Sequence, residues 1–184
     1  MVREYRRDLA VMYARRYAMG QNPLFGDFGG IGGNCTNFIS QCLYAGSCRM
    51  NYLPTFGWYY RSLDDRAPAW TGVEYFYRFL VREDGDGPFG RMVDPAEAEI
   101  GDVIQIGRRR QDGAPGIDYY HAMLIVGFSG GEPLVAAQSI ASLDRPLSTY
   151  EYDASRFLHV DGVRSDPGEP AACFAALYDA RSLQ

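Results

Sequence analysis

A cysteine that follows a glycine-rich stretch is the residue of this sequence best placed to do chemistry. Cys35 comes directly after the run 29–34, Gly-Gly-Ile-Gly-Gly-Asn, and opens a segment with helical periodicity. At a helix N-terminus, unpaired backbone N–H groups and the helix dipole favour a thiolate, and glycines let the backbone approach closely. This placement is typical of a nucleophile, whereas an isolated cysteine is more often a buried structural residue. The apolar face of the predicted helix consists of Phe38, Ile39, Cys42 and Leu43.

A nucleophilic cysteine needs a base, and the sequence contains two histidines. His121 is the polar residue at the start of the apolar run 122–126, a run typical of a central strand. His159 lies in Phe-Leu-His-Val, which is typical of an ordinary strand. We therefore predict that His121 is the base.

A hairpin turn predicts the partner that would orient this base. If Gly130 and Gly131 are the central turn residues, positions summing to 261 face each other, so Gln138 lies opposite Met123. Met123 shares a face with His121, and Gln138 becomes its diagonal neighbour. The Gln138 amide oxygen could then accept from the imidazole, as in a Cys-His-Asn triad. A register shift of one residue would favour Ser139 instead.

The remaining periodicity predicts helices first and strands second. A helix over about 5–19 precedes the cysteine helix, which we expect to end near Gly46, and Thr71–Glu74 resembles a capping box. This order indicates an α+β protein with N-terminal helices packed on a C-terminal antiparallel sheet, in one domain over residues 1–184. A loop is expected over 85–95, and the apolar run 172–178 is ambiguous. Strands are predicted over 103–106, 120–128, 134–139 and 156–160.

Composition excludes several classes of function. The 184 residues carry a net charge of −5 and no lysine, so we expect neither Schiff-base chemistry nor a nucleic-acid partner. The four cysteines are too few and scattered for a disulfide scaffold, and without a Cys-x-x-Cys motif we expect no metal site and no cofactor. We expect no membrane span and no signal peptide. An extracellular or cell-wall location is expected only if the chain is part of a longer secreted protein.

The stretch 34–43, Asn-Cys-Thr-Asn-Phe-Ile-Ser-Gln-Cys-Leu, resembles the putative amidase domain family, which is placed among the NlpC/P60-like, papain-fold cysteine hydrolases of bacteria. The resemblance extends to segments 10–14, 58–60, 101–105 and 157–160. It implies a papain-like fold, Cys35 as nucleophile, His121 as base and a polar third residue on the next strand. Many members carry histidine at that third place, where this sequence has Gln138. Asp102 also resembles a family position and suits a structural turn equally well.

We therefore expect a cysteine-dependent amidase or peptidase. Cys35 would attack an amide carbonyl, His121 would protonate the leaving amine, and water would release the acyl-enzyme. The Cys35 backbone N–H and a second donor, Asn34 or Asn37, would hold the oxyanion. The alternatives are an acyltransferase on the same scaffold and a binding module without catalysis.

The segment 52–70 is aromatic and lacks a period. Its aromatic residues either form satellite core or line a cleft over Cys35. In a cleft they would hold a peptide or glycopeptide of modest charge, such as a peptidoglycan stem, and we expect a monomer. The candidates for substrate binding are Trp58, Tyr59, Tyr60 and Trp70.

Overall fold

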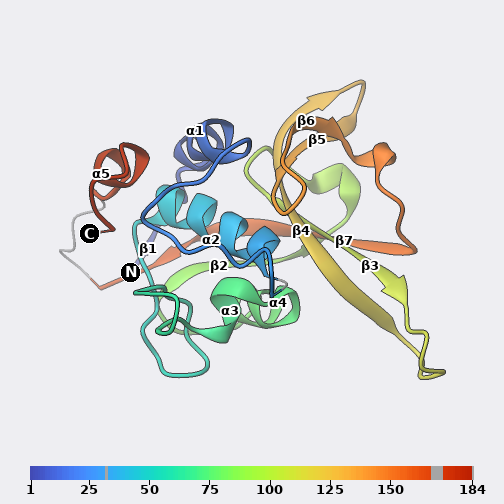
Figure 1. The fold of residues 1–184 in the computed structure, drawn as a ribbon, viewed down its shortest axis with the longest axis horizontal. Helices are drawn as coiled ribbons and strands as arrows, with labels where there is room; N and C mark the ends of the chain where they lie inside the picture. Colours follow the sequence, from blue (N-terminus) through green and yellow to red (C-terminus); the bar gives the residue numbers. More distant parts are fainter. Residues whose placement is uncertain (32, 167–171, 184) are drawn as a thin grey trace.

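The chain combines a group of helices with an antiparallel sheet, as the order of the predicted elements indicates (Figure 1). The structure is a computed structural model that describes residues 1–31, 33–166 and 172–183. Gly32, in the glycine run, lies outside the described residues. The α+β class is confirmed for the described residues, because the N-terminal helices share a hydrophobic core with one face of the sheet.

The first two helices form close to their predicted positions, and the ambiguous run 172–178 contains a short helix. The predicted capping box is wrong: Thr71 ends one helix, and Gly72 precedes the next without a side-chain cap. The helices are α1 (Arg7–Tyr17), α2 (Asn34–Ser47), α3 (Pro68–Thr71), α4 (Val73–Leu80) and α5 (Phe174–Tyr178), with 3-10 turns η1 (Pro95–Glu97) and η2 (Leu147–Thr149).

The described strands form one sheet in the order β1-β7-β3-β4-β5-β6, with β2 also paired to β7, and all pairings are antiparallel. The loop predicted over 85–95 is wrong, because β2 occupies most of it. Pro88 is tolerated in β2 because, among the described strands, β2 pairs on one side only, with β7. The strands are β1 (Val2–Arg3), β2 (Gly87–Val93), β3 (Val103–Arg109), β4 (Ile117–Ser129), β5 (Glu132–Ala137), β6 (Ser142–Pro146) and β7 (Ala154–Arg164).

Alternation along the strands divides the apolar residues between two cores. On one face, Leu124 and Leu158 pack in the cluster that contains the buried side chains of α1 and α2. On the other face, Ile104 and Met123 pack with Leu147 of η2. Helix α2 is buried along its whole length, so it is the central helix of the fold. A strand residue therefore packs toward α2 only if its side chain lies on the helix-covered face of the sheet.

A disulfide joins Cys48, at the C-cap of α2, to Cys173, just before α5. The two residues are 125 positions apart in the sequence, so their spacing gave no signal for the pairing. The other two cysteines, Cys35 and Cys42, are free and buried. The disulfide thus fixes the C-terminal helix to the far end of the helix that begins with the candidate nucleophile.

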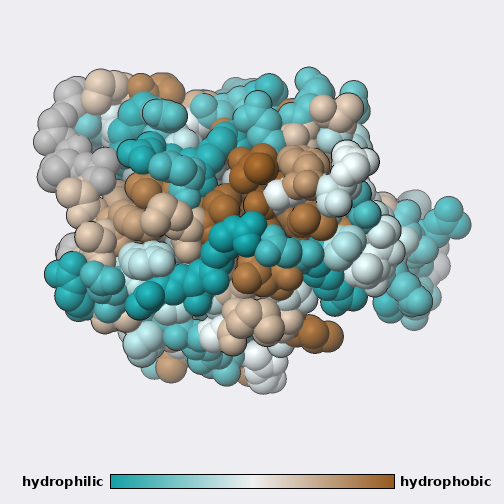
Figure 2. All heavy atoms as spheres, turned by 90° about the horizontal axis from the view of Figure 1, so that it is seen from above, coloured by the Kyte–Doolittle hydropathy of each residue, from teal (hydrophilic) through white to brown (hydrophobic). Residues whose placement is uncertain are grey.

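The surface seen from above is mixed in character. Hydrophobic residues gather near the middle of this face, and a band of hydrophilic residues crosses them (Figure 2). Within the described residues, none of the helices has both the length and the hydropathy that a bilayer crossing requires.

Candidate active site

Cys35 lies in the first turn of α2, where the sequence places it. Gly33 is the N-cap, and a Cβ at that position would lie 3.0 Å from the carbonyl oxygen of Thr71, so a side chain would crowd the backbone. The residue is 5% exposed, and its Sγ lies 3.8 Å from Oγ1 of Thr36. The first-turn N–H groups of an α-helix lack intrahelical acceptors, and the positive end of the helix dipole lies at this terminus.

His121 lies on β4, opposite Ile106 of β3. That position belongs to the face of Met123 and Ile106, away from α2, whereas Ala122 faces the α2 core. The imidazole ring stands 5.8 Å from the ring of Tyr150, between centroids. Burial, assisted by the positive charge of Arg145, lowers the pKa of His121 to about 4. The ring is therefore neutral at neutral pH, the form that accepts a proton.

The end of β4 that carries His121 nevertheless lies at the same end of α2 as Cys35. Ala122, the next residue, pairs with Gln105, whose Nε2 donates to the carbonyl oxygen of Val73 at 2.9 Å. Val73 begins α4, directly after the Thr71–Gly72 junction that touches Gly33. The structure thus places His121 at the end of the sheet nearest the first turn of α2, on the face opposite α2.

The register argument for Gln138 is wrong, although the predicted turn is confirmed. Ser129 pairs with Glu132, so positions sum to 261 beside the turn, but an irregularity between Ile125 and Gly127 changes the sum to 260 for Leu124 and Ala136. Gln138, just beyond β5, therefore takes the face of Ala122 instead of the face of His121. The bulge is a tertiary feature without a signature in the turn residues.

Gln138 is buried and fully engaged with other groups. Its Oε1 accepts from Nδ2 of Asn34 at 3.3 Å, and its Nε2 donates to the carbonyl oxygens of Tyr17 at 2.7 Å and Gly20 at 2.6 Å. These bonds join the C-terminal end of α1 to the first turn of α2. Ser139, the other candidate for the third place, is an exposed turn residue.

The two oxyanion candidates differ in the donors they have left. Asn37 donates from Nδ2 to the carbonyl oxygen of Gly26 at 3.1 Å and to Oδ1 of Asn34 at 3.2 Å, which uses both of its N–H bonds. Asn34 donates one N–H to Gln138, and among the described residues its other N–H has no acceptor. Of the two side chains, Asn34 is therefore the one that retains a donor.

Most of the predicted substrate-binding aromatics belong to the core. Trp58 and Trp70 are 0% exposed and Tyr60 is 5% exposed, so the cleft prediction is wrong for these three. Trp58 donates from Nε1 to Oγ of Ser40, which anchors it against α2. The fourth candidate, Tyr59, is half-buried and packs beside Tyr52.

Other apolar residues of the same region do reach solvent. Phe56 is 77% exposed, Tyr75 is 58% exposed and Leu53 is 57% exposed. With Phe79 at its buried side, they line a cavity of about 350 Å³ beside α4. Sequence reasoning missed these residues, because position in an aperiodic segment does not say which aromatics are buried.

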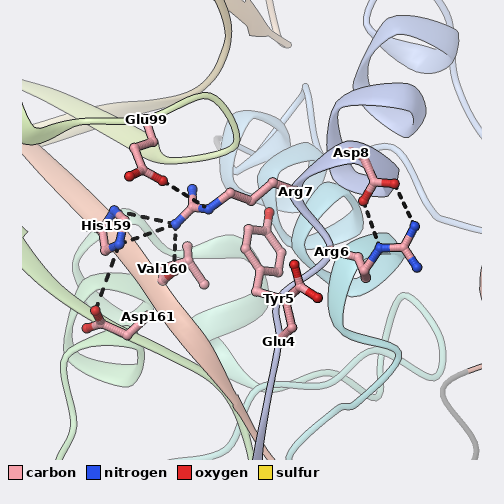
Figure 3. A pocket seen from close by; sticks show the side chains of 9 residues that line it. All are labelled: Glu4, Tyr5, Arg6, Arg7, Asp8, Glu99, His159, Val160 and Asp161. Atoms are coloured by element: carbon pink, nitrogen blue, oxygen red, sulfur yellow. Dashed lines mark hydrogen bonds and ion pairs between the residues drawn. The ribbon is translucent and has the colours of Figure 1, made fainter.

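His159 belongs to a separate charged cluster on β7 (Figure 3). Its Nδ1 lies 2.9 Å from Oδ2 of Asp102, which is completely buried and also accepts from Arg7 at 2.6 Å. Nη2 of Arg7 lies 3.4 Å from both ring nitrogens and donates to the carbonyl oxygen of Val160 at 2.7 Å. The guanidinium therefore lies against the imidazole and joins α1 to β7.

This cluster stands at the far end of α2 from Cys35. The backbone N–H of Arg6 donates to the carbonyl oxygen of Gly46, in the last turn of α2. A helix rises 1.5 Å per residue, so fourteen residues place the two ends about 20 Å apart. Asp102 and His159 are thus remote from the thiol. The cluster adjoins a cavity of about 510 Å³ that Glu99 and Asp161 also line.

The described residues hold no group of three or more histidine, cysteine, aspartate or glutamate side chains suited to a metal ion. The polar contact of the Cys35 sulfur is the Thr36 hydroxyl, and the amide side chains of Asn34 and Asn37 belong to the same first turn of α2. The arrangement supplies a thiol at a helix N-terminus and a dense set of buried amides behind it.

Comparison with known proteins agrees with the cysteine motif. The family model of the putative amidase domain matches residues 4–160, which include Cys35, His121, Gln138 and Asp102. The uncharacterized protein YhbB of Bacillus subtilis is 32% identical over 142 residues, which are 76% of this chain and 43% of that protein. The chain thus spans less than half the length of this relative. No solved structure matches. The chain belongs to the putative amidase domain family.

Proposed function

We propose that this chain is a papain-like cysteine amidase or peptidase, folded as one domain, that cleaves an amide bond through an acyl-enzyme. The observation that carries the proposal is the position of Cys35 in the first turn of α2, a placement typical of nucleophilic cysteines. Membership of a family described as an amidase domain supports the same chemistry.

The reaction begins when the Cys35 sulfur attacks the amide carbonyl and the C–N bond breaks with transfer of a proton to the leaving amine. Water then attacks the thioester and regenerates the thiol. The Cys35 backbone N–H, in the first turn of the helix, and the remaining N–H of Asn34 would donate to the oxyanion.

The base is assigned by elimination. His159 belongs to the cluster beside the other end of α2, and the two ends of this helix are about 20 Å apart, so His159 is too remote to exchange a proton with Cys35, which leaves His121. Because His121 lies on the face opposite α2, the proposal requires its strand end to turn when substrate binds. A register irregularity next to Ile106 and His121 lies at this point, where β4 can change the direction of its side chains.

The proposed substrate is a peptide or glycopeptide, such as a peptidoglycan stem. The acidic, lysine-free chain is poorly suited to a polyanion. The exposed Phe56 and Tyr75 now take the place of the buried tryptophans as candidates for contact with the apolar parts of the substrate.

The test is incubation of the protein with muropeptides, followed by mass spectrometry of the products. Hydrolysis that is lost in Cys35→Ala and in His121→Ala supports the proposal. Products that carry an added amine or hydroxyl compound would show an acyltransferase. Binding of the peptides without any turnover would show a binding module.

The required turn of β4 has a test of its own. In His121→Cys, an approach of this position to Cys35 would allow a disulfide under mild oxidation, because bonded cysteines need Cα atoms about 4.4–6.8 Å apart. A disulfide between positions 35 and 121 in the presence of substrate peptide supports the turn. Its absence, with full activity in His121→Ala, would remove His121 from the mechanism.

A further inference from the structure

Four buried side chains form a continuous chain of hydrogen bonds across the N-terminus of α2, which we call the amide relay. Nε1 of Trp70 donates to Oδ1 of Asn37 at 2.9 Å, Nδ2 of Asn37 donates to Oδ1 of Asn34 at 3.2 Å, and Nδ2 of Asn34 donates to Oε1 of Gln138 at 3.3 Å. Nε2 of Gln138 ends the relay on the carbonyl oxygens of Tyr17 and Gly20. The relay therefore connects α3, α2, the end of β5 and α1.

The two ends of the relay fix the direction of every bond in it. An indole N–H can only donate, so Asn37 must present its oxygen to Trp70. Backbone carbonyls can only accept, so Gln138 must present its nitrogen to Tyr17 and its oxygen to Asn34. Rotation of any of these three side-chain amides by 180° would place two donors, or two acceptors, against each other.

Apart from the one N–H of Asn34 that it leaves unused, the relay is buried too deeply to contact a ligand. Asn34 is 6% exposed, Asn37 is 1%, Gln138 is 7% and Trp70 is 0%. The cavity that Asn34, Asn37 and Gln138 border has a volume of about 10 Å³, which is at most the space of one water molecule. These polar groups are costly to bury unless each keeps its partner.

We propose that Gln138 is a positioning residue that acts on Cys35 through Asn34, and that the amide relay sets the orientation of the first turn of α2. This inference rests on the proposed role of Cys35 as nucleophile. Asn34 and Asn37 flank Cys35 in the sequence, so holding their side chains from both sides fixes the backbone that carries the sulfur. Gln138 has no free group to offer His121, because its oxygen and both N–H bonds are engaged.

The substitution Gln138→Glu separates this role from that of a partner for the base. A carboxylate could still accept from an imidazole, so a base-orienting residue would keep activity. In the relay, the same carboxylate would face two carbonyl oxygens with no hydrogen to donate. Trp70→Phe breaks the opposite end of the relay, because phenylalanine lacks the indole N–H that donates to Asn37. Trp70 packs in the core that contains α2.

The experiment measures the rate of Cys35 alkylation by iodoacetamide as a function of pH. It also measures kcat and KM with a muropeptide substrate, and the melting temperature of each variant. Gln105→Glu is the matched control, because Gln105 is another buried glutamine, outside the relay, that donates to a backbone carbonyl. We expect Gln138→Glu and Trp70→Phe to shift the alkylation profile in the same way. We expect both to lower kcat about tenfold to a hundredfold with little change in KM. Gln105→Glu should leave the alkylation profile unchanged.

Wild-type alkylation profiles and kcat in both relay variants would overturn the relay. Retained kcat in Gln138→Glu alone would return this residue to a base-orienting role. If one variant does not fold, the other still decides. Alkylation does not require turnover, so it tests the relay separately from the proposed function. If the relay variants shift the alkylation profile but Cys35→Ala still hydrolyses the peptide, the proposed function is refuted and the relay stands.

Discussion

Nδ1 of His159 lies 2.9 Å from Oδ2 of Asp102, in a cluster at the opposite end of α2 from Cys35. Among the described residues, the side chains against His159 are a buried carboxylate and an arginine, so we treat this histidine as structural and keep His121 as the proposed base. A buried carboxylate held by Arg7 is a structural ion pair that links α1 to the sheet.

We therefore expect Asp102→Asn to destabilise the protein without changing its chemistry. Loss of the buried negative charge removes the carboxylate that Arg7 contacts at 2.6 Å, but Arg7 is partly exposed and keeps Glu99, so we expect a cost of about 1–3 kcal/mol. Urea unfolding measures this cost, and kcat per folded molecule should equal the wild-type value. An unchanged melting temperature together with a kcat as low as that of Cys35→Ala would make Asp102 a catalytic residue instead.

The stability of the protein should fall at acidic pH in a way that depends on His121. Burial and Arg145 hold the pKa of His121 at about 4 in the folded state, below the ordinary value. The unfolded chain therefore binds a proton first as pH falls below about 6.5, and stability is lost between there and pH 4. We expect about 2 kcal/mol less unfolding free energy at pH 5 than at pH 7.5 from this residue. Urea unfolding of His121→Gln at both values should show a pH dependence smaller by that amount. Equal dependence in the two proteins would mean that His121 is not desolvated.

Trp58 and Phe56 should respond to truncation in opposite ways. Trp58→Ala removes a completely buried ring and its bond to Ser40, so a loss of about 3–5 kcal/mol is expected. Phe56 is 77% exposed, so Phe56→Ala should change stability by less than about 0.5 kcal/mol. Thermal unfolding and kinetics on a muropeptide distinguish the two. A higher KM in Phe56→Ala would place the cavity beside α4 in the substrate path, and a normal KM would exclude it.

Of the four cysteines, Cys35 should react with iodoacetamide first. Burial raises the pKa of Cys42 well above its ordinary value, and Cys42 is 0% exposed. Cys48 and Cys173 have no free thiol while their disulfide is intact. Peptide mapping after brief alkylation of the folded, unreduced protein should find label at position 35 well before any other. Equal labelling of Cys42 would refute the assignment of the nucleophile.

The sequence predicts the parts of this fold that depend on local patterns. The Cys35 helix, the apolar β4 run and the turn at Gly130 and Gly131 follow from periodicity and turn chemistry, and all three are confirmed. The partner of His121 could not be predicted in the same way. One irregularity near Gly127 reverses the face of every later residue of β5, and that irregularity depends on how the sheet curves over its two cores.

Burial of the aromatics also lay beyond sequence reasoning. Trp58 and Phe56 are two residues apart in one aperiodic segment, and they differ from completely buried to mostly exposed. Gly57, between them, lies against the backbone of Asn51: a Cβ at Gly57 would lie 2.3 Å from the carbonyl oxygen of Asn51. This close approach of two backbone segments sets which of the two aromatic side chains is buried. Such contacts between distant backbones leave no period to read.

The central helix also keeps the thiols of this protein apart. Three cysteines occur within fourteen residues, at positions 35, 42 and 48, and as a flexible chain they could form the wrong disulfide. Once α2 forms, thirteen residues of helical rise separate Cys35 from Cys48 by about 20 Å, several times the span of a disulfide. Cys42 is enclosed in the core between them. Formation of this helix therefore prevents Cys35 from forming a disulfide with Cys48, and Cys48 remains available to pair with Cys173.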